Sequence, residues 1–137
     1  TIHAGILNIK LKNYNKSVLS KRKKLSKIYF KNLKKVGDIN LFNLDKKNTS
    51  SFHQFVIRTK FRDELNKFLK IKGVDTLIHY PYMLNELKFF KNFKRLKNSY
   101  KLGNFILSLP ISEEHKINEI NYVSQMIVNF FKDKNKK

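Results

Sequence analysis

Apolar residues in the first quarter of the chain recur at the spacing of one helical face. From residue 2 to about residue 36 they approach the i, i+3, i+4, i+7 pattern of an amphipathic helix, with lysines between them. The positions are Leu7, Leu11, Tyr14, Val18, Leu25, Ile28, Tyr29 and Leu33. We predict one long amphipathic helix that ends near Gly37, because glycine readily adopts the left-handed conformation found at helix ends.

The pattern then changes from helical to extended and back. Residues 38–52 are polar and predict a surface loop. Aromatic and β-branched residues are dense over residues 52–59, which favours a β-strand. Residues 62–72 return to helical spacing, with acidic residues early and basic residues late as the helix dipole prefers, and Gly73 closes this helix.

Residues 74–104 carry a weaker pattern. A second short strand is predicted over residues 74–78, and it runs into a His-Tyr-Pro sequence at 79–81. Phenylalanines favour a short helix around residues 89–93, and residues 94–101 are typical of a polar connector.

The last third of the chain predicts one more strand and one more helix. Residues 105–110 are a short apolar run stopped by a proline, as expected for a third strand. Ser112 stands at the position of a helix N-cap, and helical spacing from Ile117 to Phe130 predicts a last amphipathic helix. The succession of elements predicts an α/β fold, in which a short three-stranded sheet is packed with helices.

Length and composition narrow the class of protein. A chain of 137 residues suffices for one hydrophobic core. It has no cysteine, which excludes disulfides and thiolate metal sites, and no apolar run near the roughly 18 residues that span a bilayer. We therefore expect a soluble, cytoplasmic protein without a membrane partner.

The net charge of +20 favours a polyanionic partner such as nucleic acid. Lysine outnumbers arginine by 26 to 4, however, and the planar arginine fork is the side chain that phosphate and base recognition favours. The chain is also rich in Asn, Ile and Phe, whose codons are A/T-rich, so nucleotide bias is the simpler cause of the lysines. An autonomous basic domain that binds nucleic acid or another polyanion is kept as the less favoured alternative.

Few residues are arranged for chemistry. The four histidines, at positions 3, 53, 79 and 115, lack helical metal-ligand spacing, and there is no glycine-rich phosphate loop or serine nucleophile elbow. We therefore assign no catalytic, cofactor-binding or metal-binding residue. His79 and Tyr80 follow a predicted strand, at the end where α/β sheets usually present ligand groups. Either their side chains hydrogen-bond a sugar hydroxyl or a phosphate, or they form a turn made rigid by Pro81.

Five segments, in order, resemble the C-terminal domain of the DegT/DnrJ/EryC1/StrS aminotransferases. They include a His-Gln-Phe-Val-Ile-Arg strand, a helix that opens with Arg-Asp, and a strand that runs into His-Tyr-Pro. The segments are residues 4–11 with Arg22, residues 53–59, 62–69, 73–81 and 107–110. The resemblance covers essentially the whole chain.

This family makes amino sugars on nucleotide carriers, using pyridoxal phosphate that a lysine holds as a Schiff base. The resemblance implies that residues 1–36 are a long linking helix and residues 37–137 the small C-terminal domain of a fold-type I aminotransferase. The cofactor domain with its lysine would precede Thr1, so the chain alone is expected to be inactive. The resemblance also implies a homodimer that transfers an amino group, typically from glutamate, to a nucleotide-linked keto-deoxy-sugar.

The resemblance places His79 and Tyr80, which match the family's His-Tyr-Pro sequence, on the nucleotide-sugar side of the cleft. Beyond them the family's Pro-x-Pro-x-His pattern is broken, because Met83 replaces the second proline and Asn85 stands near the histidine position. Residues 76–81 are most similar to members that aminate a thymidine-diphosphate-linked 3-keto-6-deoxyhexose. Without the cofactor domain, the first helix is expected to expose its apolar stripe and to promote association.

Overall fold

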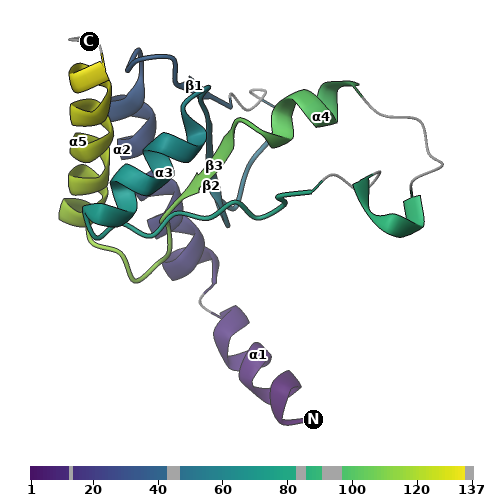
Figure 1. The fold of residues 1–137 in the computed structure, drawn as a ribbon. Helices are drawn as coiled ribbons and strands as arrows, with labels where there is room; N and C mark the ends of the chain where they lie inside the picture. The colour runs from purple at the N-terminus through teal and green to yellow at the C-terminus, as the bar shows by residue number, and fades with distance from the viewer. Residues whose placement is uncertain (13, 43–46, 83–85, 91–96, 135–137) are drawn as a thin grey trace.

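A computed structural model describes residues 1–12, 14–42, 47–82, 86–90 and 97–134. A body of helices packed on a small sheet carries two extensions, one N-terminal helix and one long connection (Figure 1). The elements are α1 (Ile2–Lys12), the π-helical η1 (Asn15–Leu19), α2 (Ser20–Leu33), β1 (Asn40–Leu41), β2 (Phe55–Arg58), α3 (Arg62–Ile71), the 3₁₀ turn η3 (Lys88–Phe90), α4 (Lys97–Gly103), β3 (Ile106–Leu109) and α5 (Ile117–Lys134).

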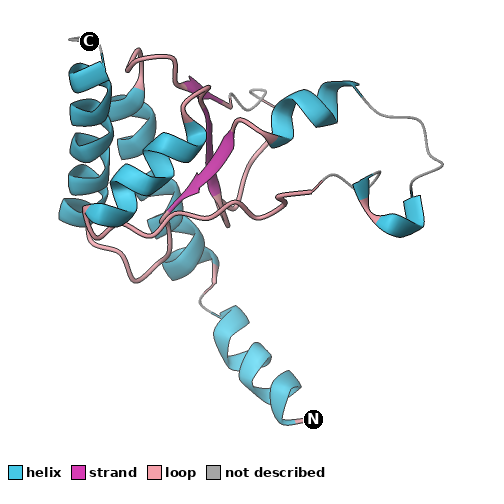
Figure 2. Ribbon diagram, viewed as in Figure 1, coloured by secondary structure: helices cyan, strands magenta, loops and turns pink. Residues whose placement is uncertain are grey.

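The three strands form one antiparallel sheet in the order β1-β2-β3. β2 pairs with β3 along its whole length, and outside β3 Leu77 adds a single bridge to Ser108. Helices α2, α3 and α5 lie together on one side of the sheet, whereas α4 lies away from them (Figure 2). The predicted α/β fold, with a three-stranded sheet packed with helices, is confirmed.

The core lies between the sheet and these helices, because strand and helix periodicities direct apolar residues toward one another. Phe55 and Ile57 alternate with less buried residues along β2, and both are buried. The Tyr29 hydroxyl at the centre donates a hydrogen bond to the Pro110 carbonyl oxygen (2.8 Å), and burial raises the pKa of Tyr29, so the phenol stays neutral. Other core residues are Leu25, Leu33, Leu65, Leu69, Leu107, Leu109, Ile120, Val123 and Ile127.

The predicted helix over residues 2–36 is helical but not continuous. A π-helical turn separates α1 from α2 between Asn15 and Leu19, and its wider turn shifts the apolar stripe. α1 buries none of its residues, so the expected exposure of the stripe is confirmed for this part, whereas in α2 Leu25, Tyr29 and Leu33 are buried in the core. α2 ends at Leu33, earlier than predicted, and Lys35 as well as Gly37 adopts a left-handed conformation (φ 64° and 52°).

Two predictions for residues 38–104 are wrong in part. Residues 74–78 do not form a strand, because Leu77 alone pairs with β3. The third strand is instead β1, a two-residue pairing inside the segment predicted to be a loop. Residues 97–103 form α4 rather than a polar connector, and the predicted helix around residues 89–93 is the short 3₁₀ turn η3, with Phe93 outside the described residues.

The bounds of α3 agree with the prediction, whereas the predicted start of α5 is wrong. α3 matches its prediction, and Gly73 closes it with a φ of 73°. Ser112 is not the N-cap of α5, because that helix begins at Ile117. The Lys116 amide instead donates to the Glu119 carboxylate (2.6 Å), half of a capping box. Within the described residues, no helix is both long and apolar enough to cross a membrane.

Candidate functional site

Strand pairing defines the face of the sheet that lies opposite α2, α3 and α5. Val56 lies opposite Ser108, and Ser108 lies opposite Leu77. Side chains of directly opposed residues share one face, and neighbours along a strand point to the other. Because Phe55 and Ile57 point into the core, Val56, Ser108 and Leu77 belong to the opposite face, which we call the open face.

His79 is fixed against this open face. Two backbone hydrogen bonds hold Leu77 to Ser108 (3.1 and 2.9 Å), and His79 follows two residues later in the chain. Its Nδ1 lies 3.0 Å from the Ser108 Oγ, while Ser108 itself is 7% exposed. The imidazole is otherwise exposed. One ring nitrogen is therefore held by the sheet, and Nε2 is left for another group.

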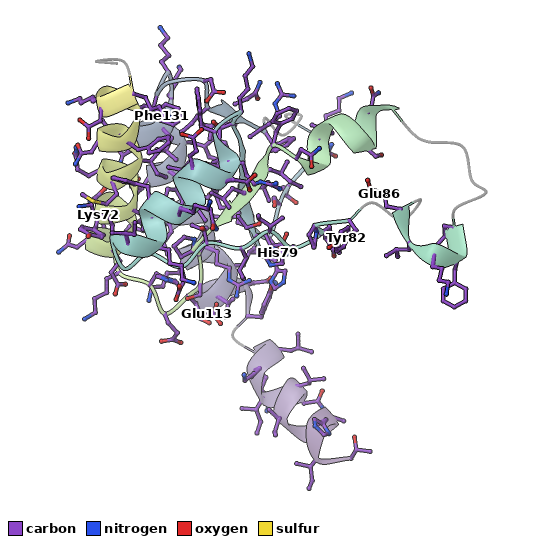
Figure 3. All side chains as sticks on the ribbon, in the orientation of Figure 1. Lys72, His79, Tyr82, Glu86, Glu113 and Phe131 are labelled. Atoms are coloured by element: carbon purple, nitrogen blue, oxygen red, sulfur yellow. The ribbon has the colours of Figure 1, made fainter. Side chains whose placement is uncertain are left out.

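Tyr80 belongs to the segment that leaves the sheet. Its side chain is 68% exposed, and that of Tyr82 is 69% exposed. His79 lies beside the sheet and Tyr82 farther out along the same segment (Figure 3). Of the two predicted site residues, His79 thus has a fixed position and Tyr80 presents a phenol to solvent. Met83 and Asn85 lie outside the described residues.

An apolar pocket of about 360 Å³ opens near the same face, on the side of β1 and β2. An aromatic cluster closes the pocket toward α2, with the Phe30 and Phe55 rings 5.1 Å apart. Its lining is Phe30, Phe42, Ser50, Phe52, Gln54, Phe55, Val56, Leu102 and Ile106. Sequence reasoning missed this pocket because its lining residues are distant from one another in the sequence.

A second polar cluster ties α2 to the loop before α5. Arg22 donates to Glu113 Oε2 from Nε (3.0 Å) and from Nη2 (2.7 Å), and its Nη1 lies 3.5 Å from His53 Nδ1. A hydrogen bond from its own backbone amide, together with the Arg22 guanidinium, lowers the pKa of the Glu113 carboxyl below its usual 4.5. The Arg22–Glu113 ion pair therefore links α2 to the loop before α5.

The remaining histidines do not converge with His79. His3 is on exposed α1, and His115 Nδ1 lies 2.7 Å from Ser112 Oγ. Three basic residues, Lys21, Lys24 and Lys116, line a pocket of about 420 Å³ between α2 and the start of α5. Across the described ranges, no group of three His, Cys, Asp or Glu side chains is placed to hold a metal ion.

The sequence matches a known family over most of its length. The sequence profile of the DegT/DnrJ/EryC1/StrS aminotransferase family covers residues 1–128. The chain belongs to this family. Its members are transaminases, and several curated relatives are named for nucleotide sugars.

Two curated relatives cover more than four fifths of the chain. The dTDP-3-amino-3,6-dideoxy-alpha-D-galactopyranose transaminase of Aneurinibacillus thermoaerophilus is 27% identical over 128 residues, which are 92% of this chain and 35% of that protein. The UDP-2-acetamido-2-deoxy-3-oxo-D-glucuronate aminotransferase of Pseudomonas aeruginosa is 31% identical over 112 residues, which are 81% of this chain and 31% of that protein. The chain therefore spans about a third of the length of these relatives.

A solved structure from the same family also resembles this chain over most of its length. The DegT/DnrJ/EryC1/StrS aminotransferase from Brucella abortus superposes with a TM-score of 0.86 and 25% identity, over 93% of this chain and 35% of that one. The superposition places the chain among the fold-type I aminotransferases.

Proposed function

We propose that this chain is the C-terminal portion of a pyridoxal-phosphate-dependent aminotransferase that transfers an amino group from glutamate to a nucleotide-linked keto-deoxy-sugar. The observation that carries the proposal is the family match over residues 1–128, within which His79 of the His-Tyr-Pro sequence is held against Ser108 on the open face of the sheet. The relative named for a dTDP-linked 3-amino-3,6-dideoxy sugar supports a 3-keto-6-deoxyhexose as the substrate.

In this proposal His79 and Tyr80 contact the nucleotide sugar. The imidazole Nε2 and the phenol of Tyr80 are both free to reach hydroxyl or phosphate oxygens, which a nucleotide sugar has in number. Pro81 restricts the backbone of Tyr80 to extended conformations, so the segment that carries both side chains leaves the sheet in one direction. Their role is to bind and orient the sugar rather than to move a proton.

The cofactor does not fit the residues of the open face. A bound pyridoxal phosphate supplies an electron sink, and it needs a lysine amine for attachment and a carboxylate near its ring nitrogen. Among the described residues, the pairing puts Asn40, Val56, Arg58, Ile106, Ser108 and Leu77 on this face, and none of these six is a lysine or a carboxylate. The family resemblance puts the attachment lysine in the cofactor domain, so we propose that it lies outside residues 1–137 and that the chain alone is inactive.

The same proposal assigns the chain to two parts of the enzyme and makes the enzyme a homodimer. Residues 1–36 serve as the linking helix and residues 37–137 as the small domain, within a cytoplasmic homodimer. The fully exposed α1 supports this division, because its apolar residues have no partner among the described residues and fit contact with another part of the enzyme.

The test uses the protein encoded by the whole reading frame that contains this chain. With pyridoxal phosphate, glutamate and a dTDP-3-keto-6-deoxyhexose, we expect formation of 2-oxoglutarate and an amino sugar. His79→Gln should raise the KM for the sugar by about 10-fold and Tyr80→Phe by about 5-fold, the value of one hydrogen bond each.

Two matched substitutions control this test. Tyr122→Phe removes the hydroxyl that donates to the Lys72 carbonyl oxygen on the outer side of α5, and His115→Gln removes an imidazole outside the open face. Both should leave KM within about twofold of wild type. No transfer to any keto-sugar nucleotide would refute the function, and an unchanged KM in both site variants would refute the site.

The basic pocket supports a second candidate function, binding of a polyanion. Lys21, Lys24 and Lys116 line it without a carboxylate among its described lining residues. If this were the chain's function, oligonucleotide affinity would fall steeply with salt, with a slope reduced by about two to three when all three lysines become glutamine. We expect weak binding instead. The affinity should fall by the same amount in the triple variant Lys67→Gln, Lys70→Gln and Lys72→Gln, whose lysines do not line this pocket.

A further inference from the structure

The contact between Ser108 and His79 joins residues 29 positions apart in the chain, and its distance is that of a hydrogen bond. The Ser108 Oγ lies 3.0 Å from His79 Nδ1. Ser108 is 7% exposed, and within the described residues its hydroxyl has no other hydrogen-bond partner. A buried hydroxyl that is left unpaired costs stability, so this one is committed to the imidazole.

The backbone around His79 is fixed on both sides. Leu77, two residues before, is tied to Ser108 by two backbone hydrogen bonds, and Pro81, two residues after, has a fixed φ. The exposed imidazole could still rotate about two side-chain bonds. The Ser108 hydroxyl is the contact that holds the ring itself.

We propose that Ser108 is a positioning residue for His79: its hydroxyl donates to Nδ1 and thereby fixes the ring with a proton on Nε2. A serine hydroxyl can donate or accept, and neutral imidazole has one nitrogen of each kind, so a donor at Nδ1 makes Nε2 a donor. The proposal rests on the proposed function, because the hydroxyl and phosphate oxygens of a nucleotide sugar accept such a hydrogen bond.

The chain contains a matched control for this proposal. Ser112 Oγ lies 2.7 Å from His115 Nδ1, a second serine–histidine pair outside the open face. Ser108→Ala and Ser112→Ala therefore remove the same atom from two similar contacts. Ser108→Ala keeps the backbone bonds to Leu77, and Ser108→Thr keeps the hydroxyl in a residue that suits a strand.

The first measurement is nitrogen-15 NMR of the imidazoles in the histidine-labelled full-length protein, at about pH 8.5, where free imidazole is neutral. His79→Gln assigns the His79 signals by their loss. We expect ring shifts of the Nε2–H form in the wild type, a shift toward the tautomer mixture of free histidine in Ser108→Ala, and wild-type shifts in Ser108→Thr. Ser112→Ala should change the His115 signals and leave those of His79 in place.

A His79 ring protonated on Nδ1, or His79 signals that Ser108→Ala leaves unchanged, would overturn the proposal. The second measurement is KM for the sugar nucleotide, which Ser108→Ala should raise about 3- to 10-fold with kcat within about twofold. If His79→Gln raises KM and Ser108→Ala does not, the positioning role is refuted while the proposed function stands. If the His79 signals move in Ser108→Ala but His79→Gln leaves KM unchanged, Ser108 does position the ring, and the contact of His79 with the sugar is refuted.

Discussion

The body of the molecule and its two extensions contain the same kinds of residue in different environments. In the body, which comprises α2, the sheet, α3 and α5, Ile57 is 0% exposed, whereas Ile9 in α1 is 71% exposed. Phe89, in the connection after Tyr80, is 93% exposed, whereas Phe55 in β2 is 3% exposed. Periodicity shows which residues share a face, but the partner of that face need not belong to the same chain.

The largest expected effect tests this difference with one substitution in two places. Ile57→Ala should lower the free energy of unfolding by about 2–5 kcal/mol, because it removes buried methyl groups and leaves a cavity. Ile9→Ala should change it by less than about 0.5 kcal/mol, because the side chain is already in water. Urea denaturation of each variant of the 137-residue chain by itself measures both values, and equal losses would mean that α1 packs as the body does.

Glycines give a second, smaller contrast. Gly37 has a φ of 52°, and a Cβ there would lie 2.1 Å from the Phe131 ring. Gly37→Ala should cost about 3 kcal/mol, from backbone strain and overpacking together. Gly73 has a φ of 73° with open space around it, so Gly73→Ala should cost about 1 kcal/mol from strain alone.

In α1, Gly5 has open space and helical conformation, so Gly5→Ala should not destabilise the chain. Thermal unfolding ranks the three variants. A Gly37→Ala loss no larger than that of Gly73→Ala would contradict the close approach of Phe131.

The smallest effect concerns the ion pair within the body. Since folding lowers the pKa of Glu113 below 4.5, this carboxylate contributes stability above that pH, and the contribution is lost as the pH falls through the folded pKa. Its size should be on the order of 0.5 kcal/mol, because the partly exposed pair is screened. Glu113→Gln should therefore be less stable than wild type at pH 7 and equal to it in acid, by urea denaturation. A difference that does not vary with pH would refute this account.

Local pattern predicted the elements that bury a complete face. The strands at β2 and β3 and the helices at α3 and α5 came from dense apolar residues or helical spacing that the core then uses. The pattern failed where tertiary pairing decides. β1 is two residues long within a polar run, and residues 74–78 look like a strand but contribute one bridge at Leu77.

The candidate site shows the same limit. His79 and Tyr80 were found from their place after an apolar run and from the family resemblance. The sequence alone did not identify Ser108 as the hydrogen-bond partner of His79, because this contact depends on the register by which residue 77 pairs with residue 108. Ser112 was predicted as a helix cap, yet it bonds His115, because α5 starts only after Lys116.

The most direct test of the central claim is to find where pyridoxal phosphate attaches. The protein encoded by the whole reading frame is incubated with the cofactor, reduced with borohydride and mapped by peptide mass spectrometry. The account predicts one phosphopyridoxyl group on a lysine outside residues 1–137. A label on one of the 26 lysines of this chain, or no label at all, would contradict it.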